Sequence, residues 1–100
     1  MAVRHIVSWK MNGETAAERA AQAREVVEAL TPLRDIVPGV LALNVYPNGF
    51  DTDGNWDVVL VSDHEDKAAL DAYAINPDHV AAAGVVKARA AARSAVDFQL

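Results

Sequence analysis

The stretch Leu-Asp-Ala-Tyr-Ala-Ile-Asn-Pro-Asp-His-Val, residues 70–80, lies between two segments with helical patterns. Proline cannot continue a helix interior but fits a first turn, so Asn76-Pro77 predicts the end of one helix and the start of the next, with Asn76 as N-cap. His79 then stands third in the second helix, where the positive helix end favours a neutral imidazole that can accept a proton. Tyr73, in the last turn of the first helix, is close enough to face the same hollow. The two form a candidate acid/base pair; the alternative is a core tyrosine beside a surface histidine that caps a helix.

Strand and helix patterns alternate on both sides of this junction. The predicted strands cover residues 2–10, 40–46, 56–62 and 94–100, and the predicted helices cover residues 14–30, 65–75 and 77–92, with a further turn at 33–37. This β-α-β-β-α-β order is the split βαβ pattern, an α+β arrangement in which helices cover one face of a four-stranded antiparallel sheet. No linker or repeat interrupts it, so we expect one domain over residues 1–100.

The predicted strands at residues 40–46 and 56–62 are apolar on both faces. Helices on one side leave the other side of the sheet open, so the open side needs another cover. A second copy of the chain is the simplest cover. We therefore expect an isologous homodimer packed sheet on sheet, with each pocket between the sheet and the helices of its own subunit. The alternative is a lone small domain that tolerates an exposed apolar patch.

Composition restricts the possible partners and compartments. The hydrophobic content of 52% predicts a folded chain, and a net charge of −5 without a basic run argues against nucleic-acid or membrane binding. There are no cysteines, which excludes disulfides and thiolate chemistry. The N-terminal apolar run is short and carries a charge, so we expect neither signal peptide nor membrane span and a cytoplasmic location. Small apolar or aromatic ligands remain possible.

His5 shares the drier face of the first predicted strand with Val7 and Trp9. A histidine among such residues is often a core side chain bonded to a backbone carbonyl. The convergence of His5 with Tyr73 and His79 in one hollow supports a different interpretation, in which the three residues form a catalytic pocket. A neutral histidine and a phenol in a dry pocket suit proton abstraction beside a carbonyl, with the histidine as base and the phenol holding the carbonyl or enolate oxygen.

Metal chemistry is not expected. Four residues of one loop alternate as in a calcium loop: Asp51, Asp53, Asn55 and Asp57. Glycine stands at the fourth place instead of the sixth, however, and Ser62 replaces the bidentate glutamate. The histidines lack the close spacing of a helical metal site. His64 has acidic neighbours on both sides, which is typical of a solvated helix start. We expect neither a metal nor a cofactor.

Five segments together resemble one known family: Val-Arg-His-Ile-Val-Ser-Trp-Lys (3–10), Val-Pro-Gly-Val (37–40), Asp-Val-Val-Leu-Val-Ser (57–62), residues 70–80 and Val-Asp-Phe (96–98). This is the stress-responsive A/B barrel family, also called Dabb or dimeric α+β barrel. The resemblance spans the whole chain and implies a ferredoxin-like subunit in a sheet-to-sheet dimer.

The resemblance also implies a site. The family includes a polyketide cyclase whose catalytic tyrosine and histidine match Tyr73 and His79, and His5 matches one of its pocket histidines. Asp57 stands where that cyclase has another pocket histidine, and Asn76 replaces the histidine of the family's usual His-Pro. We therefore expect His79 and Tyr73 to be catalytic.

The expected substrate-binding residues are His5, Val7, Trp9 and Asp57.

Three functions are compatible with this sequence. The first is a homodimeric, cofactor-independent enzyme that cyclises a carbonyl-bearing, polyketide-like substrate by aldol-type proton transfer. The second is a non-catalytic stress-responsive dimer with a structural or ligand-binding role. The third is an oxygenase-like activity, because cofactor-free oxygenases share this architecture.

Overall fold

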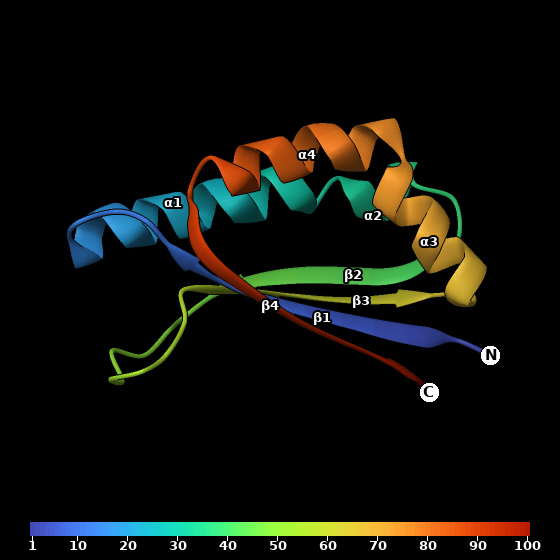
Figure 1. Ribbon diagram of the computed structural model, residues 1–100, viewed down its shortest axis with the longest axis horizontal. Coiled ribbons are helices and arrows are strands. Elements are labelled where there is room, and N and C mark those ends of the chain that lie inside the picture. The colour runs from blue at the N-terminus through green and yellow to red at the C-terminus, as the bar shows by residue number, and fades with distance from the viewer.

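The computed structural model describes residues 1–100 as one antiparallel sheet with helices packed on one face (Figure 1). The elements are β1 (Val3–Met11), α1 (Ala16–Leu30), α2 (Leu33–Ile36), β2 (Val40–Pro47), β3 (Val58–His64), α3 (Lys67–Ile75), α4 (Pro77–Lys87) and β4 (Ala90–Gln99). The strands are ordered β2-β3-β1-β4. This is the ferredoxin-like α+β fold that the element order predicts, and the short extra helix α2 occupies the predicted turn.

The expected end of the last helix is wrong. We expected it to reach residue 92, but α4 ends at Lys87 and β4 already begins at Ala90. The alanines here favour a helix by intrinsic propensity, but they pair with β1, Ala90 opposite Met11 and Ala92 opposite Lys10. Pairing with a neighbouring strand outweighs the weak local preference.

Side chains on the helix-facing side of the sheet form the core. Val7 and Leu60 are almost fully buried there, as the period-two pattern predicts. Leu41 is an exception to the period-two pattern, which would place it on the same face as Leu43. The register shifts between Val40 and Ala42, and Leu41 is 57% exposed.

The opposite face of the sheet carries no helix (Figure 1). Ile6, Val59 and Val61 lie at its centre, since strand alternation places them opposite the core residues. On the outer strands β2 and β4, the same face carries three exposed apolar side chains: Tyr46, Val96 and Phe98. We call these six residues the open face. None of the helices is both long and apolar enough to cross a membrane.

Candidate functional site

The junction between α3 and α4 sets the position of the site. Asn76 caps α4, because its Oδ1 accepts a hydrogen bond of 2.9 Å from the Asp78 backbone N–H, and Pro77 occupies the first turn. His79 is therefore the third residue of α4, and Tyr73 lies in the last turn of α3. The sequence-based placement of both residues is confirmed.

His79 is held in one tautomer. Its Nδ1 lies 3.0 Å from the Ala74 carbonyl oxygen, which can only accept, so Nδ1 carries the proton and Nε2 has the free lone pair. Burial lowers the pKa of His79, and this outweighs the raising effect of the bond to Ala74; the nearby charges of His5, Arg93 and Lys87 lower it further. Near neutral pH His79 is thus a neutral proton acceptor.

Tyr73 packs against this imidazole. The two ring centroids are 4.4 Å apart with the ring planes tilted by 46°. Tyr73 is only 2% exposed, and burial raises the pKa of its phenol to about 12. The phenol therefore keeps its proton at neutral pH and can act as a hydrogen-bond donor.

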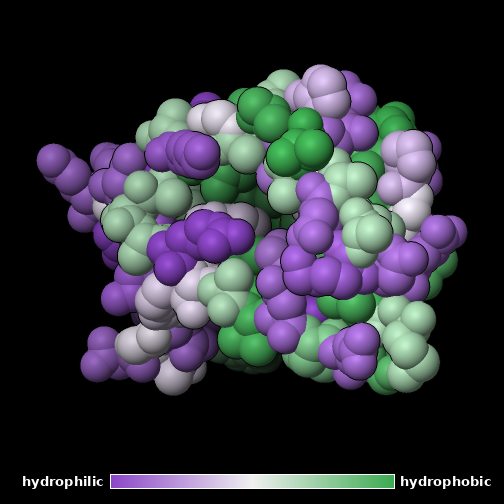
Figure 2. Space-filling view, turned by 45° about the vertical axis from the view of Figure 1, so that its right-hand side comes forward, coloured by the Kyte–Doolittle hydropathy of each residue, from purple (hydrophilic) through white to green (hydrophobic).

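Both side chains line one cavity of about 440 Å³ between the sheet and α4. Figure 2 shows apolar side chains in a hollow with hydrophilic residues around it. Three of the expected pocket residues, His5, Val7 and Trp9, line the cavity from β1. Its remaining apolar wall comes mainly from α4: Val80, Ala83 and Val86. Such a size and lining suit a small organic molecule.

Asp57 is not brought to this cavity. Its Oδ2 accepts a hydrogen bond of 2.7 Å from the Met11 backbone N–H, and its own N–H donates to the Trp9 carbonyl at 3.0 Å. Both bonds hold the start of β3 against the end of β1. The structure therefore gives Asp57 a structural position, and the resemblance that placed it in the pocket does not extend to this residue.

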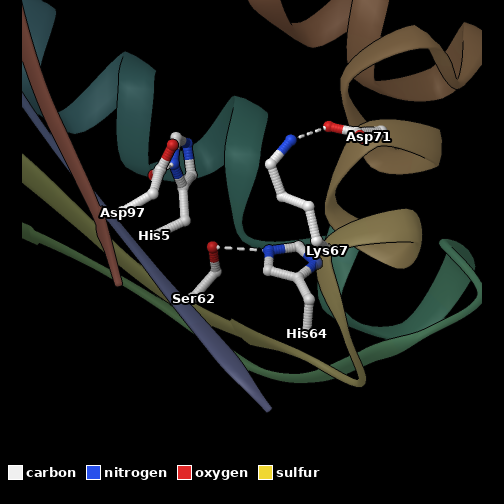
Figure 3. Close-up of polar contacts among 6 residues, drawn as sticks. All are labelled: His5, Ser62, His64, Lys67, Asp71 and Asp97. Atoms are coloured by element: carbon white, nitrogen blue, oxygen red, sulfur yellow. Dashed lines mark hydrogen bonds and ion pairs between the residues drawn. The ribbon is translucent and has the colours of Figure 1, made fainter. Parts of the chain in front are cut away.

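His5 has a carboxylate partner that the sequence analysis missed. Asp97 of β4 lies opposite His5 of β1, and its Oδ1 is bonded to His5 Nδ1 (Figure 3). The ring of His5 is 6.4 Å from that of Tyr73, centroid to centroid. Asp97 is part of the Val-Asp-Phe segment, but only the register between β1 and β4 identifies it as the partner of His5.

The interpretation of His64 as part of a solvated helix start is wrong. It is the last residue of β3, 0% exposed, with its ring 4.9 Å from that of Tyr73. Its Nε2 shares a hydrogen bond of 2.9 Å with Ser62 Oγ, whereas its Nδ1 has no partner (Figure 3). The alternation of Val58, Leu60, Ser62 and His64 indicates this inward direction, but the acidic neighbours obscured it. No group of His, Asp and Glu side chains is placed to hold a metal ion.

Two histidines with lowered pKa values, the buried His64 and the half-buried His79, make stability depend on pH. Burial is the first cause that lowers the pKa of both His64 and His79 below the 6.5 of an ordinary histidine. Below pH 6.5 these histidines bind protons in the unfolded chain, whereas in the folded chain they stay neutral to a lower pH. Their contribution to stability is therefore complete above pH 6.5 and is lost as the pH falls. We expect a lower free energy of unfolding at about pH 5.5 than at about pH 7.5, measured by urea titration of tryptophan fluorescence. The His64→Leu variant should show a smaller difference; an equal difference would contradict the contribution of His64.

The fold and the cavity together define a class: a ferredoxin-like α+β subunit with a tyrosine and histidines in a pocket between sheet and helices. The model of the stress-responsive A/B barrel domain, Dabb, matches residues 3–100. The chain belongs to this family.

Several solved structures share the fold. A dimeric ferredoxin-like protein of unknown function from Thermobifida fusca is 29% identical, with a TM-score of 0.85 over 100% of this chain and 92% of that one. Another dimeric protein of unknown function, from Bacteroides fragilis, is 24% identical with a TM-score of 0.88, covering 99% and 96%. SnoaB, a cofactor-independent oxygenase from Streptomyces nogalater, is 15% identical with a TM-score of 0.77, covering 99% and 92%. No curated protein sequence matches this chain.

Proposed function

We propose that this protein is a homodimeric enzyme that binds a carbonyl-bearing small molecule in its cavity and catalyses proton transfer on it without a cofactor. One observation carries the proposal: His79 presents a free Nε2 lone pair and Tyr73 a protonated phenol in the same cavity. The base and the hydrogen-bond donor are adjacent, and apolar side chains surround them. This is the arrangement that abstraction of a proton beside a carbonyl requires.

The chemistry follows from these two protonation states. Nε2 of His79 removes a proton from the carbon next to a carbonyl, and the Tyr73 O–H donates a hydrogen bond to the resulting enolate oxygen. In an aldol-type cyclisation the enolate carbon then forms a bond to a second carbonyl carbon of the same molecule. The new alkoxide takes back the proton from the imidazolium of His79, so the base is regenerated. A polyketide-like chain with several carbonyls is the substrate class that fits.

The hydroxyl of Tyr73 is free for this role. No hydrogen bond within the chain uses it, and it is not among the buried polar atoms that are sealed from solvent without a partner. His5, fixed by Asp97, completes the polar end of the cavity. His64 also packs against Tyr73, with ring centroids 4.9 Å apart, but does not line the cavity.

A homodimer follows from the open face and from the relatives. The proteins from Thermobifida fusca and Bacteroides fragilis are dimeric, and sheets of this kind bury an apolar face against a partner. We place the interface on the open face, so that each cavity lies between the sheet and helices of its own subunit. The cavity therefore stays accessible in the dimer.

The test is conversion of a linear triketone, heptane-2,4,6-trione, by aldol cyclisation and loss of one water to an aromatic dihydroxytoluene, followed by absorbance against a protein-free control. The Tyr73→Phe variant should lose about 10²-fold in turnover, because it removes one donor to the enolate oxygen. Its stability should be unchanged, since the hydroxyl has no partner in the chain. Tyr46→Phe, a change to an exposed tyrosine of the open face, is the matched control.

Three outcomes would count against this reaction. Equal turnover by Tyr73→Phe and Tyr46→Phe would remove the role of the phenol. Triketone binding by the unaltered protein with no conversion would favour the non-catalytic, ligand-binding dimer. Oxygen consumption during turnover would instead identify an oxygenase.

A further inference from the structure

Two cations line the cavity without an acidic partner. Lys87 ends α4 and Arg93 lies near the start of β4, and both belong to the cavity wall. The side-chain ion pairs of the chain use other cations: Arg4 with Asp63, Lys67 with Asp71, and Arg89 with Glu25. No Asp or Glu lines this cavity.

The backbone positions of these cations lie well away from those of the acid/base pair. Eight residues separate His79 from Lys87 along α4, which corresponds to about 12 Å at the rise of an α-helix. The opposite wall agrees: Arg93 pairs with Trp9, four residues along β1 from His5, which corresponds to about 13 Å along a strand. The backbone therefore carries Tyr73 and the histidines at one end of the cavity wall and the two cations at the other.

The charge of the whole chain makes this pair of cations distinctive. The net charge is −5, so most of the molecular surface repels an anion. Lys87 and Arg93 create a local positive field from two different elements, beside an apolar wall. That field extends to the other end of the cavity, since both cations contribute to lowering the pKa of His79.

We propose that Lys87 and Arg93 hold a terminal oxyanion, a carboxylate or phosphate, of an elongated apolar ligand whose other end reaches Tyr73 and His79. Guanidinium and ammonium groups are the usual partners of both anions. This inference rests on the proposed function only in taking the cavity as the ligand-binding site. It adds a substrate class: a carbonyl-bearing chain with an anionic group at the end away from the reacting carbonyl.

The test uses three probes with the same ten-carbon chain: decanoate, decyl phosphate and decan-1-ol. Binding to the unaltered protein is measured by calorimetry at low ionic strength and at ligand concentrations below micelle formation. We expect at least one of the anions to bind about tenfold more tightly than the alcohol, with the preference falling as salt is added. The tighter anion identifies whether the site favours a carboxylate or a phosphate.

The double variant Lys87→Gln/Arg93→Gln should lose this preference and keep the affinity for decan-1-ol. The matched control is Arg24→Gln/Arg34→Gln, which makes the same change in net charge at exposed helix positions outside this cavity and should keep the preference. Equal binding of anions and alcohol by the unaltered protein, or a preference that survives in the Lys87/Arg93 variant, would overturn the oxyanion site while leaving the cavity as a binding site. Failure of all three probes to bind would overturn the oxyanion site together with the ligand-binding part of the proposed function.

Discussion

Replacing His79 by alanine is expected to lower turnover about 10³-fold, the largest effect of any single substitution in the cavity. A positioned general base typically contributes 10²–10⁴-fold, and the ring of His79 lies nearer to that of Tyr73, at 4.4 Å, than the ring of His5 does, at 6.4 Å. The fold should survive, because His79 is a half-buried residue at the start of α4 whose imidazole makes one hydrogen bond, to the Ala74 carbonyl near the end of α3. The loss of that bond costs about 1 kcal/mol.

Chemical rescue distinguishes two causes of lost turnover: the absence of the base and a change in the shape of the site. The His79→Ala variant leaves a space beside Tyr73, so free imidazole added to the assay should restore part of the turnover and should not accelerate the unaltered protein. Circular dichroism and the urea midpoint serve as controls for folding. If His79→Ala turns over the triketone at the normal rate, His79 is not the base. If the substitution alters stability and no reaction is found, the dimer with a structural role becomes the better interpretation.

Introducing a charge at the centre of the open face is expected to separate the dimer. Val61 is half-buried in the lone subunit and lies between Ile6 of β1 and Asn44 of β2. A Val61→Glu substitution would place an unpaired carboxylate, and its symmetry mate, in a dry interface. An uncompensated buried charge costs about 3–5 kcal/mol, so the dissociation constant should rise about 10²–10³-fold or more.

Sedimentation velocity over a range of protein concentrations measures this change. The matched control is Val85→Glu, which adds the same charge on α4, on the helix side of the molecule and outside the cavity wall. It should leave the dimer intact. A Val61→Glu protein that still dimerises like the Val85→Glu protein would show that the open face is not the interface. The Arg4–Asp63 ion pair lies on the same side of the sheet and carries no net charge.

Local patterns predicted most of the fold and the centre of the site. Asn76-Pro77 fixes the junction of two helices by steric rules alone, and these rules also place Tyr73 and His79 on either side of it. Strand alternation placed His5, Val7 and Trp9 on one face. These features depend only on residues close in sequence, so they could be predicted without knowing how distant segments pair.

The misjudged parts depend on pairing between distant segments. The partnership of His5 with Asp97 requires the register of β1 against β4, which no local pattern contains. The same register turns the alanines after Lys87 from helix into strand. His64 was misplaced because its charged neighbours outweighed the alternation of β3, which the structure continues to the end of the strand.

The wall shared by β1 and β4 has a consequence for folding kinetics. His5 and Asp97 are 92 positions apart, so the contact between them closes nearly the whole chain into a loop and is entropically costly to form early. A chain in which β4 has not yet paired with β1 would lack the β4 part of this wall, which includes Arg93. Recovery of ligand binding during refolding should therefore lag behind recovery of helical circular dichroism, which makes the cavity a reporter of the last step of assembly.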